Sequence, residues 1–521
     1  MGRKLNPNIL YYLVFLGFVV LAVGPVIYTF FNMDGGLADN LKQLDEKVLV
    51  LLGKSSLIAL IVSVLSTVVG VILAFFLYKT KMRFRSFFKV VMLIPLLVSP
   101  YVLAVAWKDL LFFLGVDSMA VTYVGMIGVL GMIYAPLSML MVGSALTNID
   151  GQIEEAGLML TGFWPVFWKI VLPLIKPALV SSLVLVFIFS LSEFSVAAYF
   201  GVKVITTEIF TQFSAFYNYG LASLQSLLLV LICVALLFAE RKYLAEAPFL
   251  SIGAKGQRHK EYPLPQWVGV GVVGGWVFVS VVLPFLMLFA QALRGGQSVF
   301  FKAVNLLRHS FPNTIILALT GAFLVTLVGL VAGLGYFRKG RDRKVKIDFW
   351  LLLIFAIPST VYGISLIRFY NQDYWRVIYS SYGIILVGYV GKFSFIAAKI
   401  IGNSIRQIPQ SLDESAEIMG IGYWTRLRKI VLPIIGSSIQ VAFLIGFIFS
   451  LGELGTTIMV YPPGTEMMPI KVYTLMANAP EALTSAMVLV VFGVSLLSIG
   501  VLVWLGRWAK AGKSLKPKLK G

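Results

Sequence analysis

Three charged side chains lie within otherwise apolar stretches of the sequence, namely Glu193, Glu453 and Lys392. The two glutamates are 260 residues apart, and each follows the residues Phe-Ile-Phe-Ser-Leu after one intervening position. Charged groups are costly in such segments and so usually have a task. Two equivalent carboxylates could face each other across a path through the protein. They could then help a cationic or metal-bearing solute to pass. Alternatively, each acid pairs with a local basic group or with backbone and fixes helix packing, and Lys392 pairs with Glu453.

The cysteines and histidines exclude other kinds of site. Cys233 is the single cysteine, so the chain has no disulfide framework and no cysteine-rich metal site. His259 and His309 lie in different polar segments, which argues against a two-histidine metal site. We therefore assign no metal ligand firmly.

A nucleotide site is also excluded. A phosphate-binding loop requires Gly-x-x-x-x-Gly-Lys-Ser/Thr. The segments 53–55 and 512–514 both read Gly-Lys-Ser, but Val48 and Arg507 stand where the earlier glycine is required. We expect no catalytic residue and no cofactor in this chain. If the chain moves a solute against a gradient, the energy must come from a separate ATPase or from an ion gradient.

The composition indicates a membrane protein. Of 521 residues, 59% are hydrophobic and only 13% are charged, which is too apolar for an ordinary soluble protein. A net charge of +20 would suggest nucleic-acid binding in a soluble protein. Here the lysines and arginines occur in short runs between apolar stretches, which membrane topology explains better. The expected partner is therefore a lipid bilayer and not a nucleic acid.

Twelve apolar stretches are long enough to cross a bilayer as helices. Only helices and closed barrels satisfy backbone polar groups in lipid, and these stretches are too long for barrel strands. The sequence therefore predicts an all-α membrane protein with twelve transmembrane helices in two homologous six-helix halves. The expected spans lie near residues 9–31, 55–78, 87–107, 122–146, 174–198, 221–239, 266–292, 312–337, 349–367, 381–404, 434–454 and 484–506. The first half is 1–240, the linker 241–265, the second half 266–508 and the basic tail 509–521.

Basic residues are distributed unequally between the two sides of the membrane. If the N-terminus is cytoplasmic, 31 lysines and arginines lie in cytoplasmic segments and 11 lie on the other side. Cytoplasmic loops are normally enriched in basic residues. We therefore expect a multi-pass protein with both termini and the linker in the cytoplasm.

One polar helical segment occurs twice on the cytoplasmic side, at 154–173 and 414–433, and ten of its twenty aligned positions are identical. An acidic residue at its start suits the positive end of a helix dipole. A short amphipathic helix held outside the membrane is suited to docking in a cleft of a partner. Alternatively, it lies on the lipid headgroups.

Local signals define the ends of this repeated segment. Asp150 in the first copy, and Ser411 or Asp413 in the second, are candidate N-caps. Gly162 and Gly422 would allow a tight turn. The proline that closes each copy should limit or kink the following span at its entrance.

The two segments resemble the EAA motif of the membrane subunits of ATP-binding-cassette (ABC) importers. That motif reads Glu-Ala-Ala, then a glycine several residues on, then Ile-x-Leu-Pro. The second copy has Ser415 in place of the first alanine and matches at Glu414, Ala416, Gly420, Ile430, Leu432 and Pro433. The first copy matches at Glu154, Ala156, Ile170, Leu172 and Pro173. It departs at Glu155 and at Leu160, which occupies the usual glycine position, although Gly162 could substitute.

The resemblance implies a type I ABC importer fold in a bacterial plasma (inner) membrane. In that family this loop is the coupling helix, which sits in a groove of the ATPase subunit. The implied partners are two copies of an ABC ATPase, which hold ATP and Mg, and an extracytoplasmic substrate-binding protein. The residues implied in ATPase coupling are Glu154, Ala156, Gly162, Pro173, Glu414, Ala416, Gly420, Gly422 and Pro433. Because the second copy is closer to the family pattern, we expect it to tolerate change less.

The fused arrangement is similar to the ferric-iron permeases and to fused thiamine-type or phosphonate-type permeases. Iron(III) is the first choice of cargo, while thiamine, an organophosphonate, a polyamine or an oxyanion stays open. The main alternative is a twelve-helix secondary transporter driven by an ion gradient, and a channel or assembly scaffold is a third hypothesis. A channel or scaffold would need no repeated cytoplasmic docking helix, and the paired motifs favour the importer over both alternatives.

Overall fold

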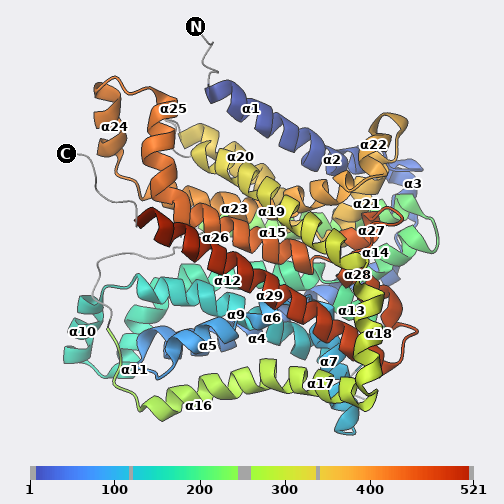
Figure 1. Ribbon diagram of the computed structural model, residues 1–521, viewed down its shortest axis with the longest axis horizontal. Helices are drawn as coiled ribbons and strands as arrows, with labels where there is room; N and C mark the ends of the chain where they lie inside the picture. The colour runs from blue at the N-terminus through green and yellow to red at the C-terminus, as the bar shows by residue number, and fades with distance from the viewer. Residues whose placement is uncertain (1–6, 117–120, 244–259, 336–340, 515–521) are drawn as a thin grey trace.

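The computed structural model describes residues 7–116, 121–243, 260–335 and 341–514, and in these residues the protein is a bundle of helices (Figure 1). The long helices run roughly parallel or antiparallel to one another, and short helices lie at both ends of the bundle. The described residues contain no β-strand, and one isolated parallel bridge joins Thr80 to Tyr262. A helical bundle is the expected solution for a chain that must satisfy its backbone in lipid.

The first half begins with two helices joined by a π-helical turn at 19–23 and ends with a long helix. Its helices are α1 (Pro7–Phe18), α2 (Gly24–Phe31), α3 (Gly36–Lys42), α4 (Glu46–Lys79), α5 (Arg85–Val91), α6 (Ile94–Leu97), α7 (Pro100–Phe113), α9 (Tyr123–Thr147), α10 (Gly151–Leu160), α11 (Phe163–Val166), α12 (Leu172–Ser192), α13 (Ser195–Phe200), α14 (Ile205–Ser214) and α15 (Tyr219–Tyr243).

The second half repeats this order. Its helices are α16 (Gln266–Val277), α17 (Leu283–Arg294), α18 (Gln297–Leu307), α19 (Ser310–Gly335), α20 (Arg341–Ala356), α21 (Ser359–Tyr370), α22 (Arg376–Tyr379), α23 (Gly383–Arg406), α24 (Gln410–Ile418), α25 (Tyr423–Arg426), α26 (Leu432–Gly452), α27 (Thr457–Val460), α28 (Met468–Met476) and α29 (Glu481–Ser514), with a 3-10 turn at Asp373–Trp375. The register is kept closely, since the π-helical turns at 167–171 and 427–431 lie one 260-residue repeat apart.

Ten helical stretches among the described residues are long and apolar enough to cross a membrane, and two bent helix pairs raise the count to twelve. The bends are 94° between α5–α6 and α7, and 105° between α20 and α21. Each bent pair lies where the sequence predicted one helical span, near 87–107 and near 349–367. Proline explains both breaks, because Pro100 begins α7 and Pro358 directly precedes α21, and proline cannot continue a preceding helix.

The fifth and eleventh spans end earlier than the sequence predicted. Helix α12 ends at Ser192 instead of continuing to 198, and α26 ends at Gly452. The next residue in each half is a glutamate with extended backbone, followed by a short helix. An uncompensated carboxylate is costly inside an apolar helix, whereas at a helix end it can accept free backbone N–H groups.

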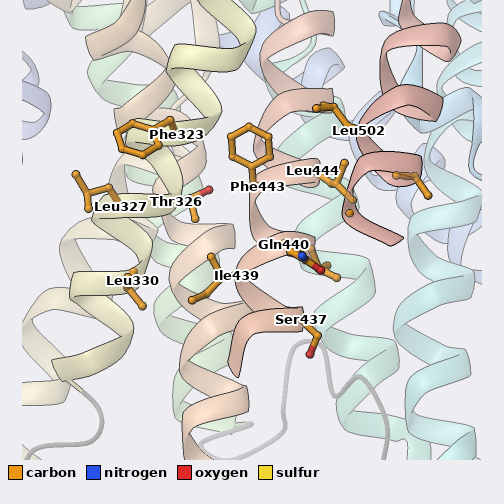
Figure 2. A pocket seen from close by; sticks show the side chains of 13 residues that line it. Phe323, Thr326, Leu327, Leu330, Ser437, Ile439, Gln440, Phe443, Leu444 and Leu502 are labelled. Atoms are coloured by element: carbon orange, nitrogen blue, oxygen red, sulfur yellow. The ribbon is translucent and has the colours of Figure 1, made fainter. Parts of the chain in front are cut away.

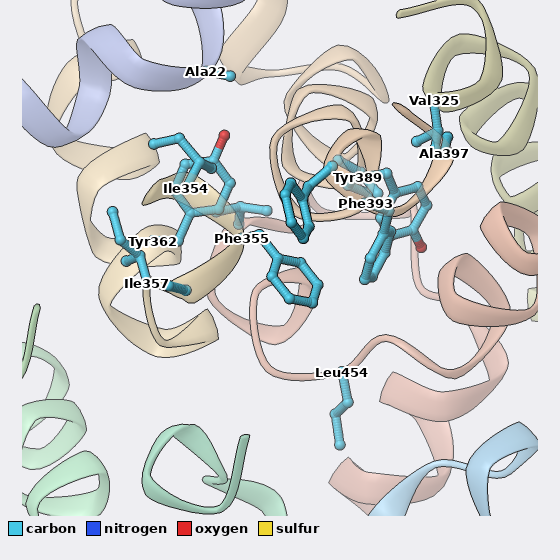
Figure 3. Close-up of a cluster of buried hydrophobic side chains, with 14 of the residues drawn as sticks. Ala22, Val325, Ile354, Phe355, Ile357, Tyr362, Tyr389, Phe393, Ala397 and Leu454 are labelled. Carbon is cyan, nitrogen blue, oxygen red and sulfur yellow. The ribbon is translucent and has the colours of Figure 1, made fainter. Parts of the chain in front are cut away.

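The largest buried apolar cluster joins the two halves (Figure 3). It includes Val102 and Ile188 of the first half together with Phe355, Tyr389 and Phe393 of the second. In Figure 3 the rings of Phe355 and Phe393 lie among the second-half helices, with Leu454 below them. The interface between the halves is therefore packed with apolar side chains around the site described below.

Helices α4 and α9 cross so closely that only a glycine fits at the contact. A methyl group on Gly70 would lie 2.5 Å from Ser138 Cβ and 2.8 Å from Met139 N. The second half repeats this crossing, since a methyl on Gly329 would lie 2.5 Å from Ala397 Cβ. Small residues permit such close approach of membrane helices.

We expect Gly70→Ala to destabilise the protein by about 1–3 kcal/mol, because backbone atoms of α9 must move to make room for the methyl group. Thermal unfolding of the purified, detergent-solubilised chain measures this. Gly53→Ala is the matched control on the same helix, because no neighbour lies within 4 Å of the added carbon. Both variants share the gain in helix propensity from glycine to alanine. Equal melting temperatures would therefore show that the contact between α4 and α9 accommodates a methyl group, which would contradict the prediction.

Candidate functional site

A cavity of about 210 Å³ lies between the two halves. Several of its lining residues occur as repeat-related pairs, one from each half: Ser99 and Ser359, Phe189 and Phe449, Glu193 and Glu453. Lys392 and Tyr134 also line it. The structure therefore brings together, in one cavity, all three charged residues that the sequence singled out inside the spans.

Glu193 lies at the junction of α12 and α13. Its Oε1 accepts hydrogen bonds from the backbone N–H of Ser195 at 2.8 Å and of Val196 at 3.2 Å, and from the Ser195 hydroxyl. These are N–H groups that the first turn of a helix leaves without partners. The other carboxylate oxygen, Oε2, accepts none of these bonds.

Glu453 holds the equivalent junction by a different geometry. Its Oε1 accepts from Thr456 N at 2.6 Å and its Oε2 accepts from Thr457 N at 2.9 Å, at the start of α27. Both oxygens are thus used in capping the short helix. The two acids therefore combine the alternatives that the sequence left open: each pairs with local backbone, and each also lines the cavity.

The ammonium of Lys392 binds backbone carbonyls and not the carboxylate of Glu453, the pair that the sequence left as an alternative. The Lys392 ammonium donates to the carbonyl oxygens of Phe355 at 3.3 Å and Ile357 at 2.5 Å, at the end of α20. The bend between α20 and α21 leaves these carbonyls without helical partners, and the negative end of a helix dipole attracts a cation. Lys392 thus stabilises the broken span from within α23.

The cavity has the chemistry of a passage more than of a tight metal site. Among the described residues, no group of three or more His, Cys, Asp or Glu side chains is placed to hold a metal ion. Two carboxylates outnumber the one ammonium on the wall, that of Lys392, which donates to two carbonyl oxygens, and the other lining residues are mostly aromatic or aliphatic. Such a wall can attract a cation without a full ligand set to retain it.

A second pocket of about 550 Å³ lies between α19, α26 and α29 (Figure 2). Its lining is largely aliphatic and aromatic, with Thr326, Ser437 and Gln440 as the main polar members. All of these residues belong to the second half, and no charged side chain lines the pocket. It therefore lacks the two-half symmetry and the charge of the central cavity.

Helices α10 and α24 project from one end of the bundle, the end at which α1 begins and α29 ends (Figure 1). Each carries an apolar tip. Met159 is 87% exposed and Met419, one repeat further on, is 78% exposed, and Leu160 and Ile418 beside them are equally open. Exposed apolar side chains on a projecting helix are typical of a docking surface.

The two projecting helices bury different faces. Glu154 is completely buried, whereas its repeat partner Glu414 is exposed. The alanines show the opposite, since Ala156 is exposed and Ala416 is buried. The closing prolines Pro173 and Pro433 are exposed in the first turn of α12 and α26.

Burial of Glu154 depends on two residues that sequence reasoning missed. The Lys79 ammonium donates to Glu154 Oε1, and the Tyr262 hydroxyl donates to Glu154 Oε2 at 2.7 Å. One signal for Lys79 was present in the sequence, because Arg338 and Lys339 stand at the corresponding place one repeat later. Those two residues lie outside the described part of the chain.

The turn after each projecting helix corrects the sequence prediction. Gly162 and Gly422 have φ angles of −77° and −63°, which any residue adopts, and they precede α11 and α25 as N-caps. The left-handed residue is Gly420, with φ of +75°. In the first copy Leu160 remains helical and Thr161 is extended, so Gly162 does not substitute for the missing glycine.

The N-cap prediction holds for one copy only. Asp150 caps α10, because its side chain accepts from Gln152 N at 3.1 Å. The predicted caps Ser411 and Asp413 are wrong, since α24 begins at Gln410, directly after Pro409. Proline fixes φ near the helical value and favours a helix start without a side-chain cap.

Two regions of the chain, residues 66–245 and 325–511, match the family described as the binding-protein-dependent transport system inner membrane component. The chain belongs to this family. Because each half carries one match, it is a fused, two-half permease of a binding-protein-dependent ABC importer, as the paired motifs predicted. Membership of this family implies a substrate-binding protein and an ATPase as partners.

Named relatives agree with this identification. The permease is 25% identical to the Fe(3+)-transport system permease protein FbpB 2 of Haemophilus influenzae over 452 residues, which cover 85% of this chain and 87% of the relative. It is 25% identical to the ferric transport system permease protein FbpB of Actinobacillus pleuropneumoniae, covering 77% and 64% of the two chains. A putative 2-aminoethylphosphonate transport system permease protein PhnV of Salmonella choleraesuis is 26% identical over 39% of this chain and 78% of its own.

Proposed function

We propose that this permease admits ferric iron, delivered by a substrate-binding protein, and that two ATPase subunits drive it through α10 and α24. The observation that carries the cargo assignment is the pair of carboxylates, Glu193 and Glu453, on the wall of the cavity between the halves. The names of the two ferric-iron transport permeases that match most of this chain support iron in particular. The mostly aromatic and aliphatic remainder of the wall supports passage rather than storage.

Transport proceeds by alternating access in this proposal. ATP binding closes the two ATPase subunits, which hold one projecting helix each, and the halves rock about the pseudo-twofold axis. Repeats of this kind allow one half to move against the other around a central site. The projecting ends are cytoplasmic, and the opposite end, with α3, α14, α22 and α28, receives the binding protein.

The cargo assignment is tested by reconstituting the permease with its ATPase and binding protein in liposomes. Uptake of radioactive iron(III) that depends on ATP is the expected result. Thiamine, an organophosphonate and a polyamine serve as competing cargoes in the same vesicles. Uptake of one of these compounds, with no uptake of iron, would refute the assignment of iron as the cargo. The proposal that the ATPase docks on α10 and α24 would not be affected.

We expect Met159→Glu and Met419→Glu each to weaken ATPase binding at least tenfold, because apolar anchors at the centre of an interface contribute about 1–3 kcal/mol each. Co-purification and binding kinetics of the ATPase on nanodisc-embedded permease measure this effect. Val377→Glu is the control, since Val377 is 82% exposed on α22 at the other end of the bundle. Undiminished ATPase binding by the Met159→Glu, Met419→Glu double variant would refute the docking assignment.

A further inference from the structure

Three residues near the end of the linker between the halves lie against the first projecting helix, α10, and the helices beside it. Lys260, Glu261 and Tyr262 are called the strap here. Lys260 Nζ lies 3.0 Å from Oε1 of Glu155 on α10, and Arg85 Nη1 at the start of α5 lies 3.0 Å from Glu261 Oε1. The strap therefore pairs with two separate elements of the first half through charges of both signs.

Tyr262 makes the central contact of the strap. Its backbone N–H donates to the carbonyl oxygen of Lys79 at 2.7 Å, and it forms a parallel bridge with Thr80 at the end of α4. Its hydroxyl donates to Glu154 Oε2 at 2.7 Å, while the Lys79 ammonium donates to Glu154 Oε1. One residue of the linker thus binds both α4 and α10.

Aromatic packing holds the Tyr262 ring between two helices. Its centroid lies 5.7 Å from that of Phe75 on α4 and 5.2 Å from that of Phe163 on α11. The residue is 5% exposed. Burial, and the hydrogen bond to Glu154, raise the pKa of Tyr262 above its ordinary value. The hydroxyl therefore remains a donor at neutral pH.

A buried ion pair is weak evidence for stability but can fix one arrangement among several. Here it fixes which face of α10 turns inward. With Glu154 tied to Lys79 and Tyr262, the exposed face of α10 carries Ala156 and the Met159 tip. On α24 the equivalent Glu414 is exposed, and a different face turns inward.

We propose that the strap is a positioning element of the first coupling point, with Tyr262 as the residue that holds α10 on α4 in the orientation that meets the ATPase. This inference rests on the proposed docking function of α10. In this arrangement, movement of α10 passes directly to the long helix α4 through the buried contacts of Glu154 and Tyr262. The linker then takes part in coupling as well as joining the halves.

Hydrogen exchange on the full-length permease in nanodiscs tests the contact itself. Tyr262→Phe keeps the ring but loses the hydroxyl, and we expect amide exchange in 151–160 to rise about fivefold, as for loss of one hydrogen bond. Tyr262→Ala should raise it further, while exchange in 410–418 stays unchanged in both variants. Tyr374→Phe is the control, since Tyr374 is 81% exposed near α22. Unchanged exchange in 151–160 for Tyr262→Ala would overturn the proposal.

Coupling is measured on the complete complex with ATPase and binding protein. We expect Tyr262→Phe to raise the number of ATP molecules hydrolysed per cargo imported, and Tyr262→Ala to raise it more, with the ATPase still bound. Faster exchange in α10 with an unchanged ratio would refute the positioning role. Retained ATPase binding by Met159→Glu would refute docking on α10 instead, and the exchange result would still report whether the strap holds the helix.

Discussion

Replacing Glu154 with arginine is expected to abolish coupled uptake and to destabilise the permease by about 3–5 kcal/mol, as for a buried charge that loses its partner. Glu154 is fully buried, and the guanidinium would lie beside the buried Lys79 ammonium and the Tyr262 hydroxyl, which would lose the carboxylate that accepts its hydrogen bond. Thermal unfolding of the purified chain and ATP-driven uptake in liposomes measure the two effects.

Glu414→Arg is the matched control at the equivalent position of the second half. Because Glu414 is exposed, its replacement should change stability by about 0.5 kcal/mol or less, and any effect on uptake reports docking alone. For stability, burial therefore predicts the opposite order to the one that the motif implied, in which the second copy tolerates change less. Equal melting temperatures for the two variants would contradict the buried pairing of Glu154.

Glu193→Gln is expected to lower iron uptake at least tenfold while leaving the fold intact. Glu193 uses only Oε1 to accept its three hydrogen bonds, so glutamine can keep that oxygen in place and turn its NH₂ group away. The variant removes the charge and keeps the cap. Uptake of radioactive iron and thermal unfolding, measured on the same preparation, separate the two properties.

Glu453→Gln should also destabilise the fold, unlike Glu193→Gln, although Glu453 is the repeat partner of Glu193. Both Glu453 oxygens accept backbone N–H groups, so the amide NH₂ must face a donor, at a cost of about 1–3 kcal/mol. Ile396→Val is the neutral control in the same wall and should leave uptake close to that of the unaltered permease. Normal iron uptake by Glu193→Gln would contradict the proposal that the carboxylates on the cavity wall assist the passage of iron.

Family, architecture and motif register were available from the sequence, because each depends on local patterns or on the repeat. Apolar stretches of sufficient length identify membrane helices whatever they pack against. The 260-residue offset aligned the two motifs and the two membrane acids, and the elements from α11 to the end of α12 recur at that offset in α25 and α26.

What only the tertiary structure decided is the orientation and pairing of particular side chains. The motif marks Glu154 and Glu414 alike, yet one is buried and the other exposed, because the partners of Glu154 lie 75 and 108 residues away in the chain. Lys392 likewise binds carbonyls 35 and 37 residues away that become free only where α20 breaks. Hydropathy and periodicity report on neighbours within a helix, whereas the free energy of a buried charge depends on groups that the fold brings to it.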